Sequence, residues 1–159
     1  MVVLPGVSDD FYLIHRDAPP LNLRATNLFA AITALTNGTP VRVTWREPFV
    51  LLHVAKDSLE PMVRVEAAAD ASDLRGKRIP GLALHLDAHW ETIQPALQRD
   101  LRRPVSPDGS SRDAWHFNRH NLAGWNLTGW EFLQALSLTG GTSVHVQKLG
   151  IFFHVPGIP

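Results

Sequence analysis

The chain has 159 residues, of which 45% are hydrophobic and 19% are charged. This composition lies outside the range of low hydrophobicity and high charge in which chains stay disordered, and the length matches one domain. Lys and Arg together number 15, as do Asp and Glu, so the formal net charge is zero and no whole-molecule field attracts polyanions. The absence of cysteine excludes disulfides, thiolate metal sites and cysteine nucleophiles. We therefore expect a single globular domain over residues 1–159.

The amino-terminal residues predict no targeting signal, because no basic segment is followed by a long apolar one. No apolar run approaches the roughly 18 residues that a membrane span needs. These observations favour a cytoplasmic location or a place within an assembled particle. Residues 11–15 form a short apolar run that ends before Pro19 and Pro20, so residues 1–20 are expected to include an edge strand or an extended arm.

The first predicted helix covers residues 23–35, where apolar side chains approximate one helical stripe. Asn22 is its predicted N-cap, and Asn37 followed by Gly38 predicts its end.

Three strands are predicted next, from alternating or continuously apolar patterns at residues 41–46, 49–54 and 62–67. Their closeness in sequence favours an antiparallel meander.

Residues 82–86 alternate as a strand, and apolar residues then recur at helical spacing as far as Leu101. Pro95 interrupts this helix at a cost of about 3 kcal/mol, so the helix is expected to kink there or to start near Thr92. A short helix over 131–138 and a hairpin over 142–155 complete the chain. The clustered strands predict an α+β fold: a mainly antiparallel sheet, one or two packed helices and a C-terminal β-hairpin.

Two pairs of histidines have a spacing that places both imidazoles on one face of a helix: His85 with His89, and His116 with His120. Four such ligands could bind zinc or another divalent metal, with Asp87 or Glu91 as a general base. This pattern supports a metal-dependent hydrolase as one alternative. The competing interpretation is that these histidines are hydrogen-bonded structural residues, which needs no cofactor.

Three of the five tryptophans lie within 16 residues, which is typical of a recognition surface because tryptophan offers a large contact area and a polar N–H. The candidate interaction residues are Trp115, Trp125, Trp130 and Phe152. The same density also suits internal packing. Solvent exposure of Trp125 and Trp130 would indicate a contact surface, whereas burial would indicate a packed corner.

Basic residues cluster at 75–78 and 99–103, and five of them are candidate phosphate contacts: Arg75, Lys77, Arg78, Arg102 and Arg103. They would suit nucleic acid if the fold brought both clusters together beside Trp115 or Trp125, on which bases could stack. Aspartates close by in sequence dilute this charge, namely Asp70, Asp73, Asp100 and Asp113. Nucleic-acid binding is therefore the second, disfavoured alternative.

The function expected first is that of a non-enzymatic structural or interaction protein without a cofactor. We expect a subunit of a homo-oligomer or larger assembly, such as a phage or virion particle, whose partners are proteins or further copies of the chain. Zero net charge, 12 prolines and the clustered tryptophans support this expectation.

Overall fold

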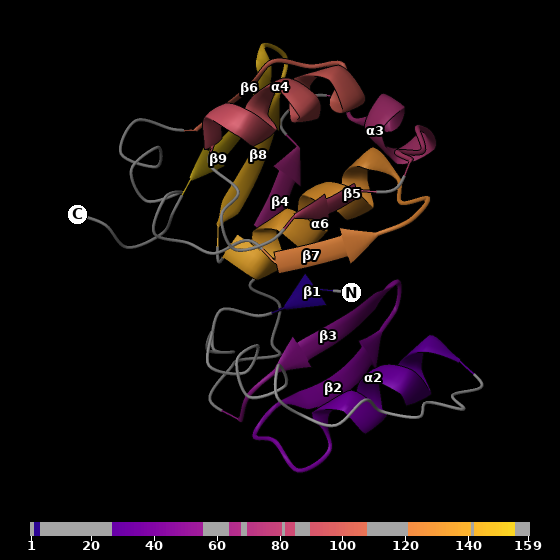
Figure 1. The fold of residues 1–159 in the computed structure, drawn as a ribbon. Coiled ribbons are helices and arrows are strands. Elements are labelled where there is room, and N and C mark those ends of the chain that lie inside the picture. Colours follow the sequence, from indigo (N-terminus) through magenta and orange to yellow (C-terminus); the bar gives the residue numbers. More distant parts are fainter. Residues whose placement is uncertain are drawn as a thin grey trace.

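The computed structural model describes residues 2–3, 27–55, 64–67, 70–80, 82–84, 90–107, 121–140 and 142–154. Within these residues the chain forms the predicted α+β fold, with two sheets and more helices than expected (Figure 1). The helices are α2 (Leu28–Thr36), α3 (Ser72–Gly76), α4 (Trp90–Leu101) and α6 (Gly129–Gly140). None of these described helices has the length and apolar character that a membrane crossing requires.

The strands are β1 (Val2–Val3), β2 (Arg42–Arg46), β3 (Phe49–His53), β4 (Arg64–Ala67), β5 (Leu82–Leu84), β6 (Val105–Pro107), β7 (Asn121–Gly124), β8 (Ser143–Gln147) and β9 (Gly150–His154). A five-stranded sheet has the order β2-β3-β1-β7-β5, and a four-stranded sheet has the order β4-β8-β9-β6. Both sheets are mixed: the five-stranded sheet is mainly antiparallel, whereas the four-stranded sheet has two parallel pairs and one antiparallel pair. The predicted C-terminal hairpin is confirmed as the antiparallel pair of β8 and β9.

In the predicted three-stranded meander, the pairing of the first two strands is confirmed and the place of the third strand is wrong. β2 and β3 form an antiparallel hairpin in which Trp45 pairs with Val50. β4 does not join them, because both edges of β3 are already paired, to β2 and to β1. Instead β4 runs parallel to β8 in the other sheet, where Val65 pairs with Val144.

The helix boundaries differ from the sequence expectations at their amino ends. α2 begins at Leu28, and its N-cap is Asn27, whose side-chain oxygen accepts a hydrogen bond from the Ala30 amide at 2.9 Å. The prediction of Asn22 was therefore wrong, because two asparagines of equal capping chemistry precede the apolar stripe. The predicted end at Asn37 is confirmed.

α4 runs through Pro95 and starts at Trp90, two residues before the predicted start near Thr92. Pro95 is exposed, so its ring does not interrupt the buried stripe of Ile93, Leu97 and Leu101. Their spacing of four residues places these three side chains on one face of the helix. α4 therefore contributes to the core in spite of the proline.

Two hydrophobic cores lie on opposite faces of β3. Phe49 and Leu51 belong to a large core with 19 buried members among the described residues, whereas Val50 and Leu52 belong to a small core with five such members. The period-two alternation of a strand explains this division. β1 repeats it, since Val2 faces the large core and Val3 the small one. The rest of the predicted amino-terminal arm lies outside the described residues.

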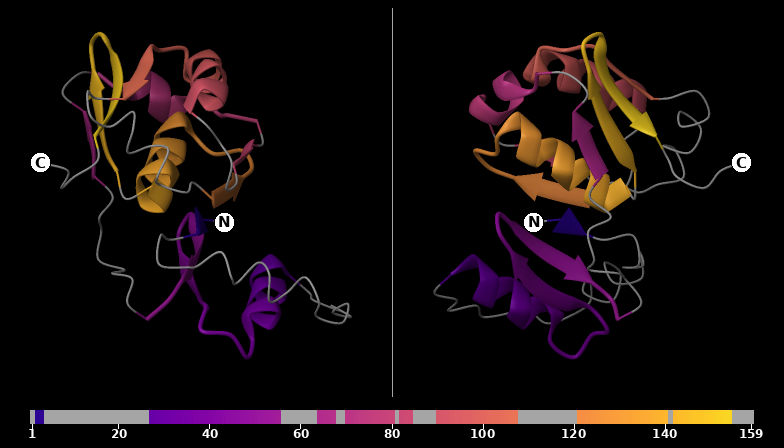
Figure 2. Two further views of the ribbon diagram at one scale, coloured as in Figure 1. Left: turned by 60° about the vertical axis from the view of Figure 1, so that its left-hand side comes forward. Right: turned by 180° about the vertical axis from the view of Figure 1, so that it is seen from behind.

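The large core surrounds α6, which packs between the two sheets with contacts to β1, β7, β4 and β8 (Figure 2). The hydroxyl of Thr139 on this helix donates a hydrogen bond to the Val3 carbonyl oxygen at 2.8 Å, which ties α6 to β1. The small core is closed by α2, which packs against β2. The molecule thus has a larger region built on α6 and a smaller one built on α2.

Candidate interaction surface

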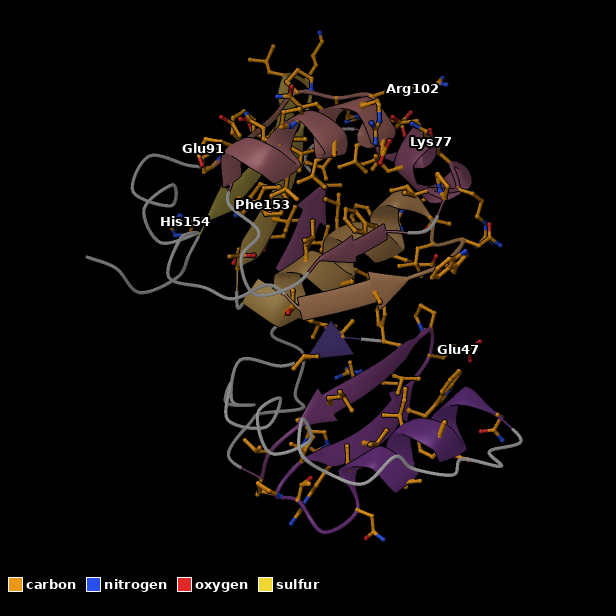
Figure 3. All side chains as sticks on the ribbon, in the orientation of Figure 1. Glu47, Lys77, Glu91, Arg102, Phe153 and His154 are labelled. Atoms are coloured by element: carbon orange, nitrogen blue, oxygen red, sulfur yellow. The ribbon has the colours of Figure 1, made fainter. Side chains whose placement is uncertain are left out.

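The fold brings the two predicted basic clusters together at one corner of the larger region. We call residues 70–79, 99–103 and 124–131 the basic corner. Two contacts join α3 to the carboxyl end of α4: the Lys77 ammonium donates a hydrogen bond to the Asp100 carbonyl oxygen, and Arg103 forms an ion pair with Asp73. Figure 3 shows Lys77 and Arg102 at this corner, on these neighbouring elements. The corner holds six cationic side chains and four carboxylates.

Arg103 holds the corner together. Its guanidinium donates two hydrogen bonds to the Asp73 carboxylate, at 3.1 and 2.6 Å, and a third to the Asp70 carbonyl oxygen at 2.9 Å. Its side chain is only 19% exposed. These hydrogen bonds engage most of the N–H groups of the Arg103 guanidinium. Arg103 therefore positions α3 and has few N–H groups available for an outside ligand.

The other carboxylates of the corner also have donors. The Ser72 amide donates to Asp70 at 2.9 Å, and this bond, with the Ser72 side chain and the nearby Arg103, lowers the pKa of Asp70. Asp100 accepts from Arg99 at 2.9 Å, which raises the pKa of Arg99. Asp70, Asp73 and Asp100 are thus engaged by these partners, whereas Asp113 lies outside the described residues.

Four cations of the corner keep their charge available: Arg75, Lys77, Arg78 and Arg102. No ion pair joins any of them to a carboxylate within the part of the chain that the structure describes. Arg102 follows the last residue of α4 in the left-handed conformation, with φ of 53°, and its side chain is exposed. The sequence named these four residues and Arg103 together as candidates, and only the structure separates Arg103, which is paired with Asp73, from the others.

Trp125 protrudes from this corner, with 81% of its surface exposed. It lies in the turn between β7 and α6, where Asn126 adopts φ of 55° and Leu127 folds back over Gly124. A Cβ on Gly124 would lie 2.6 Å from the end of the Leu127 side chain, so a larger residue there would require this leucine to move. The turn therefore has a defined shape that leaves Trp125 in solvent.

Hydrogen bonds attach this turn to the segment that follows α3. The Arg78 guanidinium donates to the Asn126 carbonyl oxygen at 2.6 Å, and the Ile79 amide donates to the Leu127 carbonyl oxygen at 2.8 Å. Arg78 also forms an antiparallel bridge with Thr128. The guanidinium of Arg78 is thereby held beside the residue that follows Trp125.

Trp130 has a different role from Trp125. It is half-buried and packs against the large core, and the Arg75 guanidinium lies 3.9 Å from the centre of its ring. This cation–π contact fixes the position of Arg75 without neutralising its charge. Of the two tryptophans of the basic corner, Trp125 is exposed, so its predicted contact role stays a prediction, and Trp130 is part of the packing.

α6 provides a firm base for the corner through a capping box that the sequence reasoning missed. The Glu131 amide donates to the Thr128 hydroxyl at 3.1 Å, and the Thr128 amide donates to the Glu131 carboxylate at 2.7 Å. The signal was present as Thr-x-x-Glu before an apolar run. Gly129 allows close packing here, since a Cβ would lie 3.2 Å from the Leu74 carbonyl oxygen.

Phe152 is not part of the basic corner. It lies on β9, opposite His145 in register and on the other face of the sheet from the buried Phe153. His145 in turn lies 3.5 Å from the Glu66 carboxylate, measured from Nδ1. Phe152 is half-buried, so its predicted contact role stays a prediction.

Trp115 and the four predicted metal ligands, His85, His89, His116 and His120, lie outside the described residues. The metal site predicted from them therefore stays a prediction. Among the side chains that the structure does describe, no group of three or more His, Asp or Glu residues is arranged to hold a metal ion.

A second exposed aromatic site, which the sequence did not reveal, lies in the smaller region. Trp45 on β2 is 58% exposed and Phe29 on α2 is 37% exposed. Their ring centres are 6.5 Å apart and the rings are nearly perpendicular, at 79°. Trp45 also pairs in register with Val50 of the small core, so part of the surface of this edge-to-face pair has a packing role.

Chemically, the basic corner can attract anionic groups through its unpaired cations and offer the face of Trp125 to a planar or apolar group. Arginine suits planar oxyanions because its N–H groups form a rigid fork. Comparison of the chain with protein-family models, with curated proteins and with solved structures finds no match.

Proposed function

We propose that this protein is a non-enzymatic interaction protein that binds an anionic macromolecule through the basic corner. The observation that carries the proposal is Trp125, which is 81% exposed in the turn bonded to Arg78, at a corner whose four cations Arg75, Lys77, Arg78 and Arg102 have no carboxylate partner among the described residues. Tryptophan and arginine are the residues most enriched among those that dominate binding energy.

The charge of the corner supports an anionic partner even though the whole chain is neutral. Salt screens exposed charges beyond about 8 Å at physiological ionic strength, so a bound partner responds to the local charge and not to the total. The carboxylates Asp73 and Asp100 are already paired with Arg103 and Arg99. They therefore offset those two arginines first, and the other four cations outnumber the remaining carboxylates Asp70 and Glu131, which accept hydrogen bonds from neutral amides.

The corner is also held in place before a partner arrives. Arg75 is stacked on Trp130, and Arg78 is bonded to the turn that carries Trp125. Immobilising a flexible side chain on binding costs about 0.5 to 1.5 kcal/mol of free energy. Because the fold already holds Arg75 and Arg78, their immobilisation should cost less when a partner binds.

Chromatography on immobilised heparin, a polyanion, tests the proposal. The protein should be retained at low salt, and the double variant Arg75→Ala/Arg102→Ala should elute at a clearly lower salt concentration. Arg42→Ala/Arg46→Ala removes two arginines from β2 in the smaller region and is the matched control, which should elute with the wild type. Passage of the wild type through the column unretained, or equal shifts for both double variants, would refute the proposal.

A second candidate function, self-association as an assembly subunit, is favoured by the Phe29 and Trp45 pair. An exposed aromatic pair is a suitable anchor for a contact between identical copies, and zero net charge provides little repulsion between them. Light scattering during size-exclusion chromatography should show an oligomer that Trp45→Ala weakens. A monomer at every accessible concentration would exclude this candidate.

A further inference from the structure

We propose that the anionic macromolecule bound at the basic corner is a single-stranded nucleic acid, with an unpaired base stacked on Trp125 and its phosphates contacted by Arg75, Arg78 and Arg102. This inference rests on the proposed function and adds the chemical class of the partner. It requires three features of the corner: an available ring, unpaired planar cations and a fixed spacing between them.

The available ring is the first feature. Trp125 is the most exposed of the large hydrophobic residues of the described chain, and the basic corner has no other exposed large hydrophobic residue among those described. A partner with an apolar surface would need a wider apolar patch to match it. A base needs only one ring, because its two faces are flat and its edges stay in water.

The cations are the second feature. Three of the four cations without an ion pair among the described residues are arginines, whose fork of N–H groups matches phosphate oxygens. A basic groove combined with an aromatic platform is the usual way in which proteins bind single strands without regard to sequence. An acidic peptide would use the charges but would leave the exposed Trp125 ring without a partner.

The fixed spacing is the third feature. Arg78 donates its hydrogen bond to the carbonyl of Asn126, the residue next to Trp125, so a cation and the ring are held within one turn of the chain. Bases within a duplex are already stacked on their neighbours and offer no free face to a protruding side chain. The corner should therefore prefer a single strand to a duplex of the same length.

Fluorescence anisotropy with a labelled oligothymidylate of about 15 nucleotides, a typical binding-site length, tests this inference. The single strand should bind at least tenfold more tightly than a duplex, and its binding should quench tryptophan fluorescence. Trp125→Ala should weaken binding by roughly 10- to 100-fold, whereas Trp125→Phe keeps a stacking ring and should retain most of the affinity. Leu149→Ala removes another large apolar side chain, 79% exposed and outside the basic corner, and is the matched control that should bind as the wild type does.

The salt dependence gives a second readout. Arg75→Ala/Arg102→Ala should reduce the slope of log affinity against log salt by about 0.7 for each phosphate that the variant no longer neutralises. Arg42→Ala/Arg46→Ala should leave the slope unchanged.

The outcomes separate this inference from the proposed function. Retention on heparin without oligonucleotide binding would overturn the inference and leave the proposed function standing. Equal binding of duplex and single strand with no effect of Trp125→Ala would also overturn it. Competition by polyglutamate at equal charge concentration would indicate an acidic protein partner instead. Loss of both heparin and oligonucleotide binding would remove both proposals.

Discussion

Trp125 and Trp45 are both exposed, but the two regions that carry them are built differently. Trp45 pairs with Val50 of the small core and contacts Phe29 edge to face. Trp125 lies in the region of the large core and is 81% exposed in a turn whose shape is set by backbone hydrogen bonds. The comparison shows that exposure alone does not identify a contact residue. What matters is whether the fold uses the side chain for its own packing.

The largest expected effect lies in the cores. Phe153→Ala in the large core should reduce the free energy of unfolding by about 3 to 5 kcal/mol, because Phe153 is fully buried and leaves a cavity. Ile32→Ala in the small core should cost about 2 kcal/mol, near the low end for such changes, because Ile32 is smaller than Phe153 and keeps 6% of its surface exposed. Urea unfolding followed by circular dichroism measures both. Equal losses would show that the small core is as tightly packed as the large one.

An intermediate effect should distinguish the two tryptophans. Trp45→Ala removes an aromatic pair worth about 0.5 to 1.5 kcal/mol and exposes part of the small core. Trp125→Ala should change the free energy of unfolding by less than about 0.5 kcal/mol, as expected for a surface residue without packing contacts. The same unfolding experiment checks both variants. A loss of more than about 1 kcal/mol for Trp125→Ala would mean that the turn depends on the ring. The contrast drawn between Trp125 and Trp45 would then be wrong.

The smallest expected effect is the pH dependence of stability that arises from Asp70 in the basic corner. The hydrogen bond from the Ser72 amide lowers the pKa of Asp70, so the native state favours the charged carboxylate. The stabilisation is therefore complete above the ordinary pKa of 3.8 and is lost as the pH falls through the lowered value. Asp70→Asn should be less stable than the wild type at neutral pH, and the difference should shrink in acid below that point.

Thermal unfolding between pH 2 and pH 7, the range that brackets carboxylate titration, measures this difference. Glu47→Gln, in the smaller region, controls for the loss of a surface carboxylate. A difference that grows as the pH falls would have the wrong sign and would contradict the role of the Ser72 amide.

Local patterns predicted most of the elements. Alternation of apolar and polar residues identified β2, and a continuously apolar run identified β3. The hairpin of β8 and β9 was also predicted from the local sequence. These patterns are visible because side chains of a strand point to opposite faces whatever the strand pairs with. The capping box of Thr128 and Glu131 was equally readable from the sequence, and missing it set the predicted start of α6 two residues too late. These features depend on residues close together in the chain, so their physical causes are visible in the sequence.

Strand partners could not be predicted in the same way. The parallel pairs of β1 with β3 and of β4 with β8 join segments separated by many residues. Which edge a strand finds depends on which edges other strands leave open, and on how α6 fills the space between the sheets. No local preference of Val2 or Val65 carries that information.

The basic corner likewise has some features that the sequence determines and others that only the fold determines. By itself the sequence determined that two basic clusters and a group of tryptophans exist, because residue type is enough to fix charge and ring chemistry. Only the tertiary structure decided that the clusters meet, that Arg103 is bound to Asp73 while Arg102 is not paired among the described residues, and that Trp125 is exposed while Trp130 packs inward. Charge pairing and burial depend on distances between residues that are far apart in the chain, and only the folded chain sets those distances.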